Sequence, residues 1–307
     1  MALVVSVPDE GLAVALGELE GARVMHWDLR SPAPEATIDL VVLPYAMGAV
    51  DLARLDGVTT RLVQTQTLGY DNLVGRVPGG HRVANAVGVH EGPTAELAVA
   101  LILASQRGLD GALRAQLERA WSREWTRGLL GARVVLIGYG GVGRAIAARL
   151  EPFGCAIEAV ATRARTVEGR DVHGTEDLEV LVGAADVVVL AVPLSGSTDR
   201  LVDGAFLARM KDGALLVNVS RGRVVDTDAL VAELRARRLR AALDVVDPEP
   251  LPPGHPLWDA PGLVLTAHVG GLVDSMAERV AALVRDQVDR LRRGKSPRYL
   301  VDLDSAS

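Results

Sequence analysis

Short aliphatic segments alternate with helical segments along most of the chain. In the first third, four aliphatic segments occupy residues 2–7, 22–27, 40–45 and 61–67, with turn residues between them. Continuous runs of Val, Leu and Ile are typical of strands that are buried on both faces of a parallel sheet. The pattern therefore predicts a small parallel-sheet domain at the start of the chain.

A helical pattern begins after Pro93 and extends over residues 94–121. Leucines recur in it at multiples of four, at Leu97, Leu101, Leu109, Leu113 and Leu117. This spacing predicts one long helix with a single, strongly apolar face.

Six further aliphatic segments predict a second sheet. They occupy residues 133–140, 156–162, 185–194, 214–222, 241–246 and 263–269. Because helical stretches such as 144–154 and 227–240 separate them, we expect a doubly wound parallel sheet of six strands. A last amphipathic helix is expected over residues 274–295, followed by a frayed tail over 301–307.

Composition narrows the class of protein. The 307 residues suit two α/β domains, and because only 3% are aromatic, aliphatic side chains must fill both cores. The net charge of −6 provides no basic field for nucleic acid or an anionic membrane. The chain shows no basic leader and no apolar run near the ~20 residues of a membrane span, and its one cysteine, Cys155, cannot form an internal disulfide. We therefore expect a cytoplasmic protein without a metal, nucleic-acid or membrane partner.

A glycine-rich turn, LIGYGGVGRAIAARL, follows the first strand of the second sheet. Gly138, Gly140 and Gly143 have the G-x-G-x-x-G spacing, which permits a tight turn, close approach of a pyrophosphate and close helix packing, respectively. Gly141 and Val142 fall at the start of the next helix, where free amides and the helix dipole attract phosphate. The segment predicts a dinucleotide site.

Three residues in distinctive surroundings indicate chemistry on a carbonyl group. They are Arg221 in VNVSRGRVVD, Glu249 in VDPEPLP and His268 in LTAHVGG. An arginine offers a planar fork of donors to a 2-oxo acid, and a histidine paired with a carboxylate can protonate the carbonyl oxygen as hydride arrives. The remaining histidines show no pairing or metal-ligand spacing, so we assign them no chemistry: His26, His81, His90, His173 and His255.

With these motifs the chain resembles the D-isomer-specific 2-hydroxyacid dehydrogenases, and in particular their glyoxylate and hydroxypyruvate reductases. The similarity extends from LVQTQTLGYDNL to HPLWDAPGLVLTAHVGG. It implies a Rossmann dinucleotide-binding domain over 94–274, inserted into a smaller flavodoxin-like substrate domain formed by 1–93 and 275–307. It also implies a homodimer through the dinucleotide-binding domain, with the helix after Pro93 in the interface.

The resemblance assigns roles to the site residues. Arg221 would clamp the substrate carboxylate, and His268, oriented by Glu249, would be the acid and base. The backbone amides of Leu68 and Gly69, in TQTLGYDN, would also bind the substrate. Because this loop carries no lysine or arginine, a phosphorylated substrate is disfavoured.

The resemblance also implies the cofactor contacts. Asp244, at the end of a predicted strand, would accept a hydrogen bond from the nicotinamide carboxamide. Pro193, Ser220 and Gly270 would line the same crevice, since open α/β sheets bind ligands at the carboxyl ends of their strands.

The end of the strand after the glycine motif departs from the NAD pattern. An acidic residue is expected there to hold the ribose hydroxyls, but Glu158 falls too early, and Thr162, Arg163 and Arg165 follow instead. Arginines and a hydroxyl would bind a 2′-phosphate that a carboxylate would repel. We therefore expect NADPH/NADP as the preferred cofactor; if these arginines are only solvated, NAD can still be used.

These observations predict an oxidoreductase that transfers a hydride between a nicotinamide cofactor and a small 2-oxo or D-2-hydroxy acid such as glyoxylate or hydroxypyruvate. One alternative is a dehydrogenase of phosphite or another small oxyanion that uses the same triad. A second, from another class, is a dinucleotide-sensing binding protein like the family's corepressors.

Overall fold

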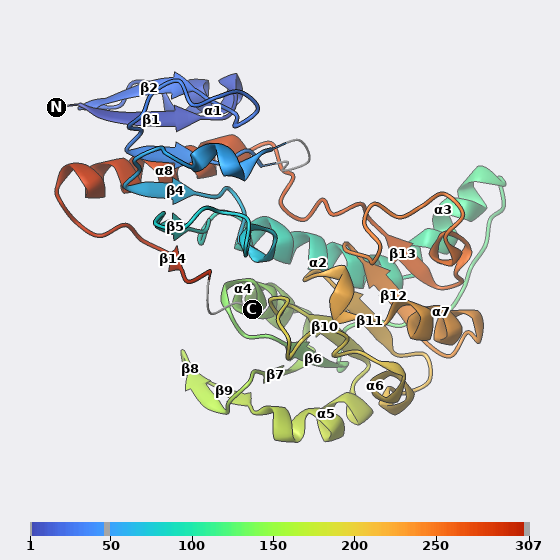
Figure 1. Ribbon diagram of the computed structural model, residues 1–307. Coiled ribbons are helices and arrows are strands. Elements are labelled where there is room, and N and C mark those ends of the chain that lie inside the picture. Colours follow the sequence, from blue (N-terminus) through green and yellow to red (C-terminus); the bar gives the residue numbers. More distant parts are fainter. Residues whose placement is uncertain (1, 46–49, 304–307) are drawn as a thin grey trace. The chain divides into compact units, whose positions relative to one another are not determined.

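The computed structural model describes residues 2–45 and 50–303 (Figure 1). The chain forms two compact units, each built around its own sheet. Unit 1 comprises Met1–His90 and Leu272–Ser307, and unit 2 comprises Glu91–Gly271. Unit 2 is thus inserted into unit 1, and the prediction of a two-part α/β fold is confirmed.

Unit 1 contains a six-stranded sheet in the order β14-β5-β4-β3-β1-β2. Its strands are β1 (Leu3–Val7), β2 (Ala22–His26), β3 (Leu40–Val42), β4 (Leu62–Gln64), β5 (Val83–Ala84) and β14 (Leu300–Val301). All neighbouring strands are parallel except the β5–β14 pair. The parallel strands have the flavodoxin-like order 2-1-3-4-5.

The faces of this sheet pack against different elements. One face meets α1 (Glu10–Leu16) and α8 (Met276–Arg292), and the other meets the loops and the 3₁₀ turns η1 (Leu52–Leu55) and η2 (Asp71–Leu73). Successive residues of β3 illustrate the alternation, because Leu40 and Val42 enter the first core and Val41 enters the second.

The end of unit 1 differs from the expected frayed tail. Leu300–Val301 form β14, which pairs with β5, and Val301 and Leu303 pack on the second core. Two-residue strands leave no hydrophobic period in the sequence, which is why β5 and β14 were not predicted. Residues 304–307 of the expected tail lie outside the described part.

Unit 2 contains an eight-stranded sheet in the order β13-β12-β11-β10-β6-β7-β9-β8. Its strands are β6 (Arg133–Ile137), β7 (Ala156–Val160), β8 (Arg165–Val167), β9 (Arg170–His173), β10 (Val187–Leu190), β11 (Leu215–Asn218), β12 (Arg240–Leu243) and β13 (Leu263–Leu265). Its helices are α2 (Glu91–Gln106), α3 (Leu109–Leu117), α4 (Gly141–Leu150), α5 (Leu178–Ala184), α6 (Gly204–Arg209) and α7 (Thr227–Arg235), with 3₁₀ turns η3 (Glu151–Phe153), η4 (Thr175–Asp177), η5 (Gly222–Val224) and η6 (Pro256–Asp259).

The predicted doubly wound sheet is confirmed, with two additional strands. Strand order reverses between β6 and β10, the switch point at which such sheets bind ligands. The additional strands form the β8–β9 hairpin, in which β9 runs parallel to β7 and β8 antiparallel to β9. Because no residue of β8 is fully buried, the hairpin has no aliphatic pattern from which it could be predicted.

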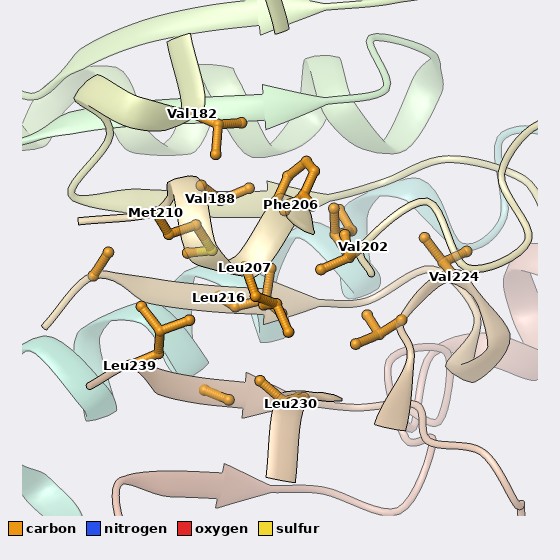
Figure 2. Close-up of a cluster of buried hydrophobic side chains, with 14 of the residues drawn as sticks. Val182, Val188, Val202, Phe206, Leu207, Met210, Leu216, Val224, Leu230 and Leu239 are labelled. Carbon is orange, nitrogen blue, oxygen red and sulfur yellow. The ribbon is translucent and has the colours of Figure 1, made fainter. Parts of the chain in front are cut away.

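Two hydrophobic cores cover the faces of the large sheet. Val135 and Ile137 of β6 point into one core, and Val134 and Leu136 point into the other. Figure 2 shows the first core, where Phe206, Leu207 and Met210 lie against side chains of β10 and β11. The second core includes α2 and α4, which lie close together because α2 presents small residues such as Ala95 and Ala98.

The single long helix expected after Pro93 is wrong. The chain breaks at Gly108, which has a left-handed backbone with φ of 60°, so α2 and α3 are separate helices. Leu101 is buried, but Leu109, Leu113 and Leu117 are 49%, 62% and 86% exposed. The apolar side chains therefore pack into the core of unit 2 only in α2, before Gly108. None of the helices within the described ranges is long and apolar enough to cross a membrane.

Candidate functional site

The candidate residues of unit 2 follow the carboxyl ends of six parallel strands. Gly138 follows β6, Thr162 follows β7, and Pro193 follows β10. Arg221 and Asp244 follow β11 and β12, and His268 follows β13. All these strands pair in parallel, so the residues meet at one edge of the sheet.

The glycine motif forms a turn that other residues could not form. Gly138 has φ of 98°, and a Cβ there would lie 2.3 Å from the Ala191 carbonyl oxygen. A Cβ on Gly143 would lie 2.0 Å from the Gly138 carbonyl oxygen, so helix α4 packs directly on the turn. Beside Gly140, by contrast, no heavy atom lies within 4 Å of an added Cβ.

This open space adjoins the amino end of α4. The helix begins at Gly141, so the amides of Gly141 and Val142 belong to its first turn, where N–H groups have no intrahelical acceptor. The partial positive charge of that end attracts anions. The turn therefore fits a pyrophosphate.

The segment after β7 carries cations in place of an acidic residue. Thr162, Arg163 and Arg165 are exposed, and within the described ranges neither arginine has a carboxylate partner. Arg165 Nη1 donates to the carbonyl oxygen of Arg163 at 3.4 Å. Glu158 points to His173, with its Oε2 3.1 Å from Nε2 of the ring. The loop thus offers donors and no competing acid.

The sequence indicated no pairing for the other histidines, but both ring nitrogens of His173 are bonded to carboxylates. Besides Glu158, its Nδ1 lies 3.0 Å from Asp177 Oδ2. The bond to Asp177, helped by Glu158 and opposed by partial burial, raises the pKa of His173 above its usual value. The three residues belong to β7, β9 and η4, so this cluster ties the β8–β9 hairpin to the sheet.

His268 and Glu249 form the predicted pair. Nδ1 of His268 lies 2.6 Å from Oε1 of Glu249. Both side chains are 42% exposed, so they remain open to a substrate. Within the described residues, Nε2 of His268 has no hydrogen-bond partner, and it is therefore the nitrogen that can exchange a proton with a ligand.

Asp244 fixes the loop that carries His268. Its carboxylate is buried and accepts hydrogen bonds from the Thr266 hydroxyl at 2.6 Å, the Val269 amide at 2.8 Å and the Gly270 amide at 2.9 Å. The His268 amide donates to the Asp244 carbonyl oxygen at 2.7 Å, and His268 itself has φ of 53°. A carboxylate has about four acceptor positions, so roughly one remains for a ligand.

Arg221 is oriented by its neighbours in the same turn. Its Nη1 donates to the Ser220 carbonyl oxygen at 2.8 Å, and its own carbonyl oxygen accepts from Asn218 Nδ2 at 2.9 Å. Ser220 is buried, and its amide and hydroxyl both donate to Asn218 Oδ1. Gly222 lies so close to the Val246 carbonyl oxygen that a Cβ would be 1.8 Å from it, which joins this turn to the segment leading to Glu249.

Two other expected wall residues are held by threonines. The Thr198 hydroxyl donates to the Pro193 carbonyl oxygen at 2.6 Å. The Thr94 hydroxyl lies 3.5 Å from the Gly270 carbonyl oxygen. These contacts fix the two backbone segments through their carbonyl oxygens.

In unit 1, the loop after β4 presents backbone amides. The Leu68 carbonyl oxygen accepts from Asn85 Nδ2 at 2.9 Å, and the Gly69 carbonyl oxygen accepts from the Thr67 hydroxyl at 2.7 Å. In the part of the chain that the structure describes, the amides of Leu68 and Gly69 donate to no protein acceptor. The loop can therefore donate to an anion.

Sequence reasoning missed several supporting residues. Asn218 orients the Arg221 turn, Thr266 bonds Asp244, and Arg223 is ion-paired with Asp199. Only Asn218 carried a signal, because an amide at the end of an otherwise aliphatic strand is unusual. No group of three His, Cys, Asp or Glu side chains among the described residues could bind a metal ion.

Comparisons with known proteins identify the family. The family model "D-isomer specific 2-hydroxyacid dehydrogenase, NAD binding domain" matches residues 99–270. The chain is 31% identical to the human glyoxylate reductase/hydroxypyruvate reductase, over 94% of this chain and 93% of that one. It is 35% identical to the glyoxylate reductase of Pyrococcus horikoshii, over 79% of this chain and 76% of the relative.

A solved structure agrees. The D-isomer specific 2-hydroxyacid dehydrogenase from Xanthobacter autotrophicus Py2, in complex with NADPH and MES, has a TM-score of 0.86 and 25% identity, covering 100% of this chain and 99% of that one. The chain therefore belongs to the D-isomer specific 2-hydroxyacid dehydrogenases and is an NAD(P)-dependent oxidoreductase of that family.

Proposed function

We propose that this enzyme is an NADPH-preferring reductase of small 2-oxo acids, with glyoxylate and hydroxypyruvate as the best substrates. The observation that carries the proposal is the 2.6 Å bond between His268 Nδ1 and Glu249 Oε1, at the same sheet edge as Arg221. Unit 2 would be the dinucleotide-binding domain and unit 1 the substrate domain, and His268 would act on substrate bound by Arg221.

The proposed chemistry follows from the hydrogen bonds of these residues. When bound, the reduced nicotinamide supplies the hydride that is added to the carbonyl carbon of the substrate. Glu249 holds His268 with Nδ1 as the donor to the carboxylate, so a protonated Nε2 gives its proton to the carbonyl oxygen as negative charge develops there. In the reverse direction the neutral Nε2 removes the proton from the hydroxyl group.

Arg221 and the loop of unit 1 are proposed to bind the substrate carboxylate. A guanidinium can form two parallel hydrogen bonds with a carboxylate, which fixes the plane of the 2-oxo acid. Leu68 and Gly69 would add amide donors. Because TQTLGYDN contains no cation, a small unphosphorylated acid is the better substrate class.

Asp244 is assigned two contacts. It holds the His268 loop by the bonds described above, and its remaining acceptor position would bind the nicotinamide carboxamide. Pro193, Ser220 and Gly270 would form the wall of the cofactor site.

The activity is tested by assaying oxidation of NADPH and NADH with a panel of 2-oxo acids, and reduction of both oxidised cofactors with phosphite. We expect glyoxylate or hydroxypyruvate with NADPH to give the highest kcat/KM. His268→Ala should lower kcat by ~10²-fold or more while NADPH still binds. His255→Asn, which keeps a cap for η6, is the control. Normal turnover in His268→Ala would remove His268 from the mechanism, and activity with phosphite alone would favour the oxyanion alternative.

The cofactor preference is tested by a second variant. Thr162, Arg163 and Arg165 are proposed to bind the 2′-phosphate of NADPH, and each charge-assisted hydrogen bond contributes about 1.5–3 kcal/mol. Arg163→Ala/Arg165→Ala should therefore raise the KM for NADPH by at least about tenfold and change the KM for NADH little. Arg149→Ala/Arg235→Ala removes two other exposed cations of unit 2 and is the control. Equal kcat/KM for the two cofactors in the wild type would reject this preference.

A homodimer is also proposed, through α3 and the segment that follows it. Four large apolar side chains at intervals of four residues are exposed there. Leu113, Leu117, Trp121 and Trp125 are 62%, 86%, 94% and 105% exposed. Apolar surface of this extent on a monomer marks an interaction site. A second copy of the chain is the proposed partner, because the family resemblance implies a homodimer with the helix after Pro93 in its interface.

A further inference from the structure

A polar pocket of about 250 Å³ opens on unit 1, away from the residues considered so far. It is lined by Thr60, Arg61, Gly80, Arg82, Leu291, Gly294, Lys295 and Ser296. Arg61 directly precedes β4 and Arg82 directly precedes β5, so the pocket lies at the amino ends of these parallel strands. The Leu68–Gly69 loop follows the carboxyl end of β4. The pocket therefore lies at the amino ends of the strands, and the proposed substrate loop lies at their carboxyl ends.

Three cations line this pocket. Arg61 is partly neutralised, since its Nη1 lies 3.9 Å from Asp39 Oδ1. Arg82 and Lys295 are exposed, and neither is ion-paired with a carboxylate in residues 2–45 and 50–303. In a chain with a net charge of −6, a hollow that gathers unpaired positive charge is unusual. Like charges that line one pocket repel one another, and a bound anion would relieve that repulsion.

Size and donor geometry define the class of ligand. A volume of 250 Å³ lies below the ~300–1,000 Å³ of pockets that hold drug-sized molecules. Arg82 offers a planar fork of donors, Lys295 a compact charge, and Ser296 a hydroxyl. This combination suits a tetrahedral oxyanion. We propose that the pocket binds a small phosphate-bearing anion, either inorganic phosphate or the phosphate group of a small metabolite.

The pocket is connected to α8 and β4. Nη2 of Arg61 donates to the Leu291 carbonyl oxygen at 2.8 Å, in the last turn of α8. One turn earlier in the same helix, Gln287 Nε2 donates to Gln64 Oε1 at 2.9 Å, and both glutamines are fully buried. Figure 1 shows α8 beside β4. An anion that holds Arg61 therefore restrains both elements.

The same hydrogen bonds continue to the loop after β4. Gln64 Nε2 donates to the carbonyl oxygens of Thr65 at 2.8 Å and Asn85 at 3.0 Å. Asn85 Nδ2 in turn donates to the Leu68 carbonyl oxygen at 2.9 Å. Occupation of the pocket thus stabilises the strand and side chains that support this loop, and ligand binding raises the melting temperature of the protein.

The test titrates inorganic phosphate into the full chain by calorimetry, with chloride keeping the ionic strength constant. Because the cations proposed for the cofactor also attract phosphate, the titration is made in wild type, in Arg163→Ala/Arg165→Ala and in Arg82→Ala/Lys295→Ala. We expect the first two to retain a common phosphate site and the third to lose at least about tenfold in affinity for it. The thermal shift with phosphate should decrease in parallel.

Several outcomes decide the proposal without reference to enzyme activity. Unchanged affinity in Arg82→Ala/Lys295→Ala, or loss of all binding in Arg163→Ala/Arg165→Ala, would overturn it. Arg82→Glu provides a second variant and should abolish the site by charge reversal. Tighter binding of glycerol 3-phosphate than of phosphate would identify an organic phosphate as the ligand, and equal or weaker binding would identify the free ion. Circular dichroism confirms that each variant is folded.

Discussion

Asp244 is the residue of the site whose side chain accepts the most hydrogen bonds from the loop that carries His268. Three donors converge on its buried carboxylate, and all three belong to the segment around His268. Asp244→Asn would turn an amide group toward one of these donors and leave it unsatisfied. We expect a loss of about 1–3 kcal/mol in the free energy of unfolding. We also expect a fall of about 10- to 100-fold in kcat, because His268 is no longer held in place.

Thr266→Val separates positioning from cofactor binding, because it removes one donor to Asp244 and leaves the carboxylate intact. It should lower kcat less than Asp244→Asn does and leave the KM for NADPH unchanged. Asp247→Asn, an exposed change in the neighbouring segment, is the control. Denaturant titration and steady-state kinetics provide both readouts. A normal kcat in Asp244→Asn would mean that the loop keeps its conformation without the carboxylate.

Arg221→Lys tests the proposed clamp. Lysine keeps the charge but cannot form two parallel bonds with a carboxylate, so kcat/KM for a 2-oxo acid should fall about tenfold or more. Arg223→Lys lies two residues away, in a side chain already paired with Asp199, and should change kcat/KM little. Similar effects of the two substitutions would reduce Arg221 to a general counter-ion.

Residue chemistry was predictable where a short motif carries it. Gly138 and Gly143 occupy positions that no larger residue could fill, and the spacing of the motif alone indicates this. The contacts of Asp244 with its donors and of His173 with Glu158 were not predictable, because the partners are 22 to 26 residues away in the first case and on another strand in the second. Such pairs arise from strand register, which a single sequence does not specify.

At the scale of elements, hydrophobic patterns predicted the buried strands and failed where burial is partial. The continuous leucine spacing after Pro93 suggested one helix, although Gly108 interrupts it and α3 buries none of its residues. The β8–β9 hairpin was missed because its two strands bury a single residue, Val172. Both failures concern elements that contribute few side chains to the core.

The His173 cluster should make the stability of the hairpin depend on pH. The bond to Asp177 raises the pKa of His173 in the folded state, so its stabilising contribution is complete below the unfolded pKa of 6.5. This contribution disappears as the pH rises through the folded pKa. The wild type should therefore exceed His173→Gln in melting temperature by more at pH 5.5 than at pH 9.

Asp177→Asn is the matched variant, because it removes the largest cause of the raised pKa and keeps the histidine. The pH-dependent part of the stability difference should shrink in that background. A difference between wild type and His173→Gln that stays the same across this pH range would show that the ring contributes through packing alone.

At the scale of the whole molecule, the proposed dimer gives a direct prediction. Trp121→Ser/Trp125→Ser should shift the protein toward monomer in light scattering at micromolar concentration, because these exposed indoles would supply much of the interface. Val14→Ser/Val180→Ser removes exposed apolar side chains elsewhere and should leave the assembly unchanged. A monomeric wild type would reject the dimer proposal.

The insertion of unit 2 has a consequence for biosynthesis. Proteins usually acquire structure from the amino terminus as the ribosome releases the chain. Here residues 1–90 must wait, because their sheet and core require α8 and β14, which are translated after unit 2. Unit 2 is continuous from Glu91 to Gly271 and can complete its own core earlier. Unit 2 should therefore fold first, while residues 1–90 remain exposed to chaperones and proteases until α8 and β14 have been synthesised.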